Sequence, residues 1–218
     1  MIQELKQWAL GFLFPSFCVS CRTSGEWWCE DCRQSVQKNT DQICPACLSM
    51  GDHECAGTLP FKQVWSLGYY HDPKLRSAIT ALKFNGTSAL KDDLRKFVSD
   101  RLPVLPEGAV MIPMPLAEKR LKERGFNQAE LIAALIGNFR TDCLIRSVHR
   151  DPQSSMAHDL VERGMNIRHC FKTVGDVPKN IILIDDVITT GATAAEAARV
   201  LLSAGAETVS VLTLAIGA

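Results

Sequence analysis

The chain has 218 residues, 46% of them hydrophobic, which is enough for one mid-sized globular domain and a small additional module. Its formal net charge at pH 7 is zero, so nucleic-acid binding would require a local basic patch rather than an overall basic field. The sequence contains no run of 18 apolar residues, so none of its segments resembles a membrane-spanning helix.

The first 14 residues carry an amphipathic pattern. Apolar residues recur there at helical spacing: Ile2, Leu5, Trp8, Ala9, Phe12 and Leu13. This spacing predicts a short packing helix, and its aromatic residues leave association with the inner face of a membrane open. Glu4 lies in the first turn and no small-residue cleavage site follows, so the segment does not read as a signal peptide. We therefore expect a cytoplasmic protein.

Seven of the nine cysteines lie between residues 18 and 55. In a chain without an export signal, closely spaced cysteine pairs indicate a metal site rather than disulfides. Two C-x2-C turns, with seven residues between them, supply Cys18, Cys21, Cys29 and Cys32. Four thiolates in this arrangement predict a closed, structural zinc site.

A second cysteine set is less complete. Cys44 and Cys47 form another C-x2-C turn, and Cys55 follows, but Thr58 stands where a fourth cysteine would be expected. His53 could supply a nitrogen ligand instead, which would give a second zinc site. The alternative is a degenerate ribbon held by packing alone. A module this small needs metal to supply its folding free energy, so residues 1–60 are predicted to be a zinc-ribbon module with an amphipathic helix.

Beyond residue 60 the pattern alternates between strands and helices, which predicts a largely parallel α/β sheet flanked by helices over residues 61–218. The predicted strands are 61–70, 109–112, 143–145, 181–184 and 208–214, and the predicted helices are 73–84, 88–102, 127–139 and 194–203.

Two polar segments lie between these elements. The first follows the strand at 109–112 and is predicted to be a basic loop that contains Lys119, Arg120, Lys122 and Arg124. Arginine forks bind phosphate oxygens in pairs, so this segment could hold a diphosphate, although a solvated basic loop is the alternative. The second, residues 146–171, is long enough to be a lid or binding segment. Its His149 and His158 are given no catalytic role.

Residues 181–193 are the most informative stretch. Four apolar residues are followed by Asp185 and Asp186, then by a Thr/Gly loop, then by a helical run. A loop that enters a helix N-terminus offers free N–H groups to a phosphate, and Gly191 lets the backbone approach it closely. The carboxylates can accept hydrogen bonds from sugar hydroxyls or hold a hydrated Mg²⁺. The expected phosphate-binding residues are Ile188, Thr189, Thr190, Gly191, Ala192 and Thr193.

This stretch closely resembles the phosphoribosyl pyrophosphate (PRPP) motif of type I phosphoribosyltransferases. Together with the cysteine pairs and the segment around Arg-Gly-Phe-Asn-Gln, it makes nearly the whole chain resemble the ComF/GntX family. The resemblance implies a zinc ribbon on a type I phosphoribosyltransferase-like domain. It also implies a cytoplasmic role in natural competence, in which single-stranded DNA is taken up or used as a nutrient.

The resemblance also assigns residues. Asp185 and Asp186 match the family's acidic pair, and residues 189–193 match its 5-phosphate loop. The basic and lid-like segments are matched by Arg120, Arg124, Gln128, Gln153, Arg163 and Asn166. Thr58, in place of a zinc cysteine, is one departure from the family pattern. The other is the Ser-Val-His-Arg-Asp-Pro run before Gln153, where the family usually has a more basic segment.

Three functional hypotheses follow. The protein could be a transferase that binds PRPP with Mg²⁺, with the acidic pair stabilising the oxocarbenium-like ribose and Arg120 or Arg124 the leaving diphosphate. It could be a non-catalytic adaptor whose basic segments track the backbone of single-stranded DNA. It could also be an interaction module whose zinc ribbon and N-terminal helix dock a partner such as a competence helicase.

Overall fold

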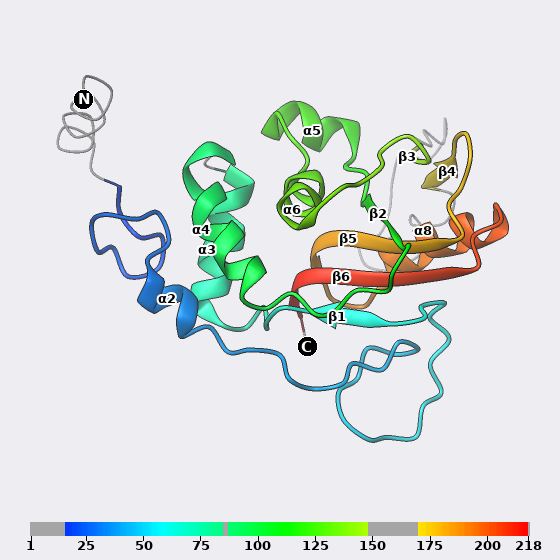
Figure 1. Ribbon diagram of the computed structural model, residues 1–218, viewed down its shortest axis with the longest axis horizontal. Coiled ribbons are helices and arrows are strands. Elements are labelled where there is room, and N and C mark those ends of the chain that lie inside the picture. Colours follow the sequence, from blue (N-terminus) through cyan, green and yellow to red (C-terminus); the bar gives the residue numbers. More distant parts are fainter. Residues whose placement is uncertain (1–15, 85–86, 148–169, 218) are drawn as a thin grey trace, which may run out of the picture.

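A computed structural model describes residues 16–84, 87–147 and 170–217. Its central sheet contains four parallel strands in the order β1–β6–β5–β2 (Figure 1). They are β1 (Val64–Ser66), β2 (Val110–Pro113), β5 (Asn180–Ile188) and β6 (Thr208–Ile216). The prediction of a largely parallel α/β fold is therefore confirmed.

Two further strands, β3 (Leu144–Arg146) and β4 (Phe171–Thr173), pair antiparallel in a small separate sheet. Arg146 stands opposite Phe171 in this pair, and its guanidinium carbon lies 5.4 Å from the centre of the Phe171 ring. The pairing and the ring contact thereby fix Arg146 relative to β4.

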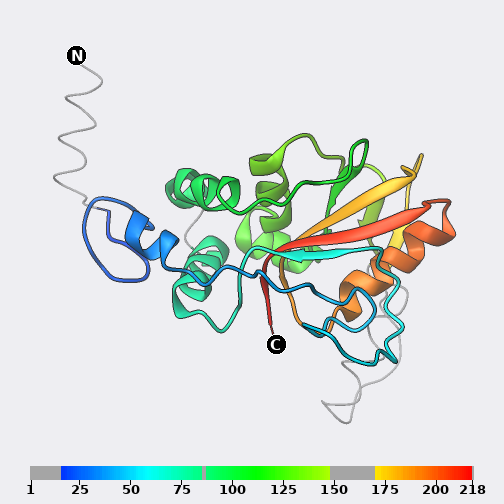
Figure 2. The ribbon, with the colours of Figure 1, turned by 60° about the horizontal axis from the view of Figure 1, so that its bottom comes forward.

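Helices cover both faces of the sheet. Alternate residues of β5 point to opposite sides: Ile182 and Ile184 belong to one buried cluster, and Ile181 and Leu183 to the other. The first cluster includes apolar residues of α3 (Pro73–Phe84), α4 (Thr87–Ser99) and α6 (Gln128–Ile136). The second includes the alanine-rich side of α8 (Ala192–Ser203), which lies across the sheet from α6 (Figure 2).

The predicted basic loop at 119–124 is wrong, because these residues form helix α5 (Glu118–Arg124). An ion pair between Lys122 and Glu118, 2.6 Å apart and one turn apart, supports the helix. Gly125 ends it in a left-handed conformation with a φ of 77°. The helix is short and has no buried residue, so it gave no apolar periodicity in the sequence.

Some element boundaries also differ from the sequence predictions. The strand predicted at 61–70 shortens to the three residues of β1, whereas β5 continues past its apolar run to Ile188. The helix predicted to end at residue 139 ends at Ile136, because Gly137 adopts an extended conformation that no helix continues.

The cysteine-rich segment packs against the larger domain at two separate places. Its first part, with helix α2 (Glu30–Gln34), lies beside α3 and α4 (Figures 1 and 2). Trp28 is fully buried there with its ring centre 4.8 Å from that of Phe97, and Arg33 forms a 2.9 Å ion pair with Asp93. The second part runs along β1 toward α8. Division of the chain at residue 60 stays a prediction.

The predicted amphipathic helix at 1–14 lies outside the described residues. Among the helices that the structure does describe, none combines the length and the apolar character that crossing a membrane requires.

Candidate functional site

A cavity of about 320 Å³ opens at the carboxyl ends of β5 and β2. These strands are neighbours, but the chain leaves them toward opposite faces of the sheet, since β5 leads into α8 and β2 leads toward α6. Open parallel sheets bind ligands at this kind of topological switch point. The cavity is therefore where the fold itself would lead one to expect a ligand.

One wall of the cavity is the loop between β5 and α8. Gly191 has a φ of 71°, and its carbonyl accepts a 2.7 Å hydrogen bond from the amide of Ala195 in the first turn of α8. The first amides of a helix have no partner within the helix, and its dipole favours an anion there. Thr189, Thr190 and Thr193 line the same wall and can donate from their hydroxyls. We call residues 188–193 the phosphate loop.

The floor of the cavity holds the two adjacent carboxylates. Asp185 accepts a 2.8 Å hydrogen bond from the amide of Asp186, and Lys83 Nζ lies 2.9 Å from Asp186 Oδ2. Burial, and secondarily the charge of Asp186, raises the pKa of Asp185 to about 7. This carboxyl group therefore changes charge near neutral pH.

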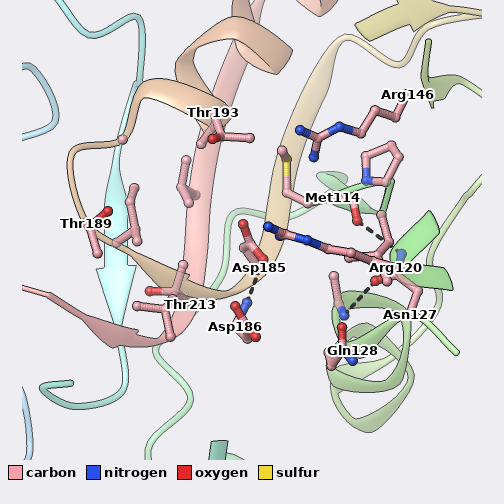
Figure 3. Close-up of a pocket in the computed structure, with 18 of the residues that line it drawn as sticks. Met114, Arg120, Asn127, Gln128, Arg146, Asp185, Asp186, Thr189, Thr193 and Thr213 are labelled. Carbon is pink, nitrogen blue, oxygen red and sulfur yellow. Dashed lines mark hydrogen bonds between the residues drawn. The ribbon is translucent and has the colours of Figure 1, made fainter. Parts of the chain in front are cut away.

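The opposite wall is basic. Arg120 and Arg124 stand one turn apart on α5 and line the cavity, whereas Lys119 and Lys122 of the same helix do not. Arg146 at the end of β3 completes the group. Figure 3 shows the side chains of Arg120 and Arg146 reaching into the cavity toward the side of Asp185 and Thr193. Guanidinium groups in this position suit a ligand with several phosphate oxygens.

Two amide side chains form the cavity end near α6. Asn127 caps α6 by accepting a 3.0 Å hydrogen bond from the amide of Ala129, and its Nδ2 donates to the Met114 carbonyl at 3.0 Å. Gln128 is 3% exposed, and its Oε1 accepts a 3.0 Å hydrogen bond from Arg124. Its Nε2 is buried without a partner in the described part of the protein. A buried donor without a partner is costly and points to a ligand acceptor.

The structure thus brings the two predicted phosphate-binding segments together around one cavity. The side chain of Ile188 is buried in the core, so this residue can serve a ligand only through its backbone. Lys83 was not singled out in the sequence, and Arg146 entered only as the first residue of the predicted lid or binding segment at 146–171. Neither lies in a motif, and each reaches the cavity from a distant element. Gln153, Arg163 and Asn166, as well as His149 and His158, lie outside the described residues.

The first cysteine set forms a compact cluster. All four sulfur atoms of Cys18, Cys21, Cys29 and Cys32 lie within 4.8 Å of one another, and Cys21 and Cys29 are 3.6 Å apart. Four thiolates around a tetrahedral zinc, with Zn–S bonds of about 2.3 Å, stand about 3.8 Å apart. The cluster therefore fits a zinc ion. Cys18 and Cys32 are buried, as expected for a closed, structural site.

The second set also converges, and His53 takes the fourth position. Cys44, Cys47, His53 and Cys55 present ligand atoms within 4.8 Å of one another. Cys47 Sγ is 3.0 Å from His53 Nε2, and His53 Nδ1 lies 2.9 Å from the Gly51 carbonyl. With its Nδ1 proton donated to that carbonyl, the ring leaves Nε2 unprotonated for a metal, as in many zinc sites. The geometry favours the metal-binding prediction over a ribbon held by packing alone.

The C-x2-C turns that begin at Cys18 and at Cys44 share one backbone design. In the first knuckle (residues 17–24), Arg22 follows the second cysteine with a φ of 66°; in the second (residues 43–50), Leu48 does so with a φ of 67°. Each knuckle is closed by an antiparallel bridge, Phe17 with Ser24 and Ile43 with Met50.

Each knuckle also prepares one thiol for a metal. A neighbouring hydroxyl group, from Thr23 beside Cys21 and from Ser49 beside Cys47, lowers the pKa of that thiol to about 6. A lowered pKa favours the thiolate form that binds metal. Both turns are therefore built to present thiolates.

A search for relatives gave clear matches, although no protein-family model matches the chain. It is 34% identical over 206 residues to the competence protein ComFC of Bacillus subtilis, a match that covers 85% of this chain and 82% of that protein. The chain belongs to the ComF family. The DNA utilization protein YhgH of Escherichia coli O6:H1 is 30% identical over 221 residues, covering 90% of this chain and 95% of that protein. ComFC of Streptococcus pneumoniae is 28% identical over 196 residues, covering 85% and 86%.

These matches extend over most of the chain, so the ComF assignment concerns the cysteine-rich segment and the sheet domain together. The family resemblance found in the sequence is confirmed. The names of these ComF relatives connect them with competence and with DNA utilization.

Proposed function

We propose that this protein binds PRPP, with Mg²⁺, in the cavity between β5 and β2, and that it acts in the cytoplasm in the uptake or use of incoming DNA. One observation carries the proposal: a single cavity combines a Thr/Gly loop at a helix N-terminus, an acidic pair and three arginines. A phosphate, a ribose and a diphosphate require these three environments in one place.

The 5-phosphate would occupy the phosphate loop. The amides at the start of α8 and the hydroxyls of Thr189, Thr190 and Thr193 are its donors. No lysine follows Gly191, so the loop relies on backbone and hydroxyl donors rather than on the point charge of a P-loop lysine.

The ribose would lie over the acidic pair. Asp186 is held by Lys83, and Asp185 by the Asp186 amide, so both carboxylates are fixed before a ligand arrives. Each can accept hydrogen bonds from ribose hydroxyls. As the bond between C1 and the diphosphate breaks, the ribose gains positive charge, and fixed carboxylates nearby stabilise it.

The diphosphate would face Arg120, Arg124 and Arg146, which line the other wall of the cavity. Bound Mg²⁺ would neutralise diphosphate oxygens and so favour departure of the leaving group. Gln128 Nε2, the buried donor without a partner, would donate to an oxygen of the ligand. A phosphoribosyl transfer is consistent with this arrangement, and the acceptor is left unassigned.

The connection with DNA comes from the relatives. ComFC proteins are named for competence and YhgH proteins for DNA utilization, and their matches span most of this chain. We therefore assign this protein the same general role. In this proposal its zinc module binds a protein partner, such as a competence helicase.

A second candidate function uses the same cavity without turnover. Lys83, Arg120, Arg124 and Arg146 gather positive charge at one place on a chain whose formal net charge is zero. Such a basic groove could hold phosphates of single-stranded DNA. In that case PRPP and DNA would compete, and DNA affinity would fall steeply with salt.

The deciding experiment is a calorimetric titration of PRPP and MgCl2 into the full-length, zinc-loaded protein. We expect saturable binding that is lost in the Asp185→Asn/Asp186→Asn double variant, which keeps the size of both side chains. Absence of PRPP binding by the folded parent would overturn the proposal. Salt-sensitive binding of single-stranded DNA by that same parent would then favour the adaptor.

A further inference from the structure

The second knuckle touches the phosphate loop. A methyl group added at Gly191 would lie 3.0 Å from Leu48 Cδ1, 3.2 Å from Leu59 Cδ1 and 3.5 Å from Phe61 Cε2. Leu48 and Phe61 are buried, at 7% exposure each, in the same cluster as Ile188. The loop that would receive a phosphate is thus packed from behind by residues of the cysteine-rich segment.

Two of these contacts come from residues that are hydrogen-bonded to the C-x2-C turn of the second metal site. Leu48 follows Cys47 in a left-handed conformation, and its amide donates a 2.9 Å hydrogen bond to the Cys44 carbonyl. The amide of Leu59 donates a 2.9 Å hydrogen bond to the carbonyl of Ala46, inside the same turn. Gly57 passes so close to Ala46 that a Cβ there would lie 2.2 Å from its oxygen. The turn therefore positions both leucines.

The third contact has a different anchor. Phe61 precedes Lys62, whose amide donates a 2.8 Å hydrogen bond to the carbonyl of Val209 in β6. Phe61 would stay in place if the turn were disordered. Loss of the metal should thus remove part of the packing behind Gly191 rather than all of it.

The first knuckle offers a natural comparison. Its Cys18 belongs to the other buried cluster, together with Cys32 of the same metal site and apolar residues of α3 and α4. Ser20 of this knuckle donates to the Lys74 carbonyl of α3 at 3.3 Å. The two knuckles share a backbone design but belong to different buried clusters, and the second is the one in contact with Gly191.

We propose that the second knuckle positions the phosphate loop, so that metal binding by Cys44, Cys47, His53 and Cys55 sets the loop's affinity for a phosphate group. The choice of PRPP as the phosphate ligand in this inference rests on the proposed function. Metal binding orders a small cysteine module. An ordered knuckle holds Leu48 and Leu59 against the loop, and a loop that is already ordered loses less entropy when a ligand binds.

The test compares two matched cysteine variants. Cys55→Ser disrupts the second metal site and Cys21→Ser the first; both cysteines are exposed, and each stands close to a partner sulfur, at 3.5 and 3.6 Å. Amide hydrogen exchange of residues 188–193 is measured without any ligand, together with zinc content. Each variant should lose one of two zinc ions. Exchange of the loop should accelerate in Cys55→Ser and stay at the parent rate in Cys21→Ser.

A second pair keeps all metal ligands. Leu48→Ala removes the contact with Gly191, and Ile43→Ala truncates another buried residue of the same knuckle that is not among the atoms nearest Gly191. Leu48→Ala should keep both zinc ions, accelerate exchange in the loop and weaken PRPP binding by about tenfold. Ile43→Ala should leave loop exchange and PRPP affinity close to the parent values.

The outcomes separate the two proposals. Equal loop exchange in Leu48→Ala and Ile43→Ala, or a parent that binds a single zinc, would overturn the positioning role. A parent that does not bind PRPP would overturn the proposed function, while the exchange rates would still decide whether the second knuckle orders the loop.

Discussion

Lys83 Nζ lies 2.9 Å from Asp186 Oδ2, and this ion pair joins the last turn of α3 to the strand β5 that carries the acidic pair. The two side chains are 24% and 15% exposed, so the pair is partly shielded from water. Lys83 also acts on the neighbouring carboxylate, because its charge lowers the pKa of Asp185 against the stronger effect of burial. One lysine from a distant helix thus lowers the electrostatic cost of placing two carboxyl groups side by side.

Lys83→Met should therefore destabilise the folded protein by about 1 kcal/mol or more at pH 8, because a partly buried carboxylate loses its partner. A matched control is Lys179→Met, which removes a pair with Glu207 whose side chains are 67% and 63% exposed. Exposed pairs contribute little, so the control should change stability by roughly 0.5 kcal/mol or less. Urea unfolding of both variants and the parent measures this difference. Equal effects would contradict the role given to Lys83.

The raised pKa of Asp185 predicts a pH dependence of stability. Its pKa of about 7 in the folded protein, against 3.8 as the ordinary value, means that the folded state holds this proton more tightly. The stabilising contribution is therefore complete below about pH 4 and is lost as pH rises to 7. Asp185→Asn should remove this loss. The stability of this variant relative to the parent should increase between pH 5 and pH 8. Thermal unfolding of both proteins at each pH measures this difference. A constant difference would mean that the carboxyl is not perturbed.

The same variant should lose ligand binding. An asparagine cannot carry the negative charge that the ribose site requires, so Asp185→Asn should bind PRPP at least about tenfold more weakly at pH 8. Greater stability together with weaker binding is the signature of a strained functional residue. Calorimetry on the samples used for unfolding provides the comparison.

The strand, loop and helix at 181–203 could be predicted from the sequence because their signals are local. A buried run, two acids, a Thr/Gly turn and a helical run follow one another within 23 residues. The metal ligands were predictable for the same reason, since each C-x2-C pair fits in one turn. Even the substitute role of His53 depends on residues that are close in the sequence.

The rest of the site depends on tertiary packing. Lys83 and Arg146 arrive from the end of α3 and from a three-residue strand, and neither position carries a local signal. Helix α5 lacked an apolar stripe, and its one large apolar residue, Leu121, is 42% exposed. The contact between Leu48 and Gly191 joins segments that nothing in the sequence connects. Such relationships appear only when the chain is folded.

Two substitutions at Gln128 can separate the role of its buried donor, Nε2, from that of its acceptor, Oε1. Gln128→Leu removes both: it eliminates the unpaired buried donor, and it leaves the partly exposed Arg124 to hydrogen-bond with water instead of Oε1. The protein without ligand should therefore be about as stable as the parent. Gln128→Glu keeps an acceptor for Arg124 but removes the donor. If Nε2 donates to the ligand, both variants should weaken PRPP binding by about tenfold. Binding restored in Gln128→Glu would instead assign the residue to the positioning of Arg124.

Helix α5 supplies its own control for the basic wall. Arg120 and Arg124 line the cavity, whereas Lys122, on the same helix, pairs with Glu118 at 2.6 Å and does not. Arg120→Ala should weaken PRPP binding by about tenfold or more, because hydrogen bonds to charged groups contribute about 1.5–3 kcal/mol each. Lys122→Ala removes the same charge and should leave the affinity unchanged. If general electrostatic attraction governs binding, both variants should weaken it equally, and the effect should disappear in high salt. A loss confined to Arg120→Ala that persists in high salt would identify a direct contact with the diphosphate.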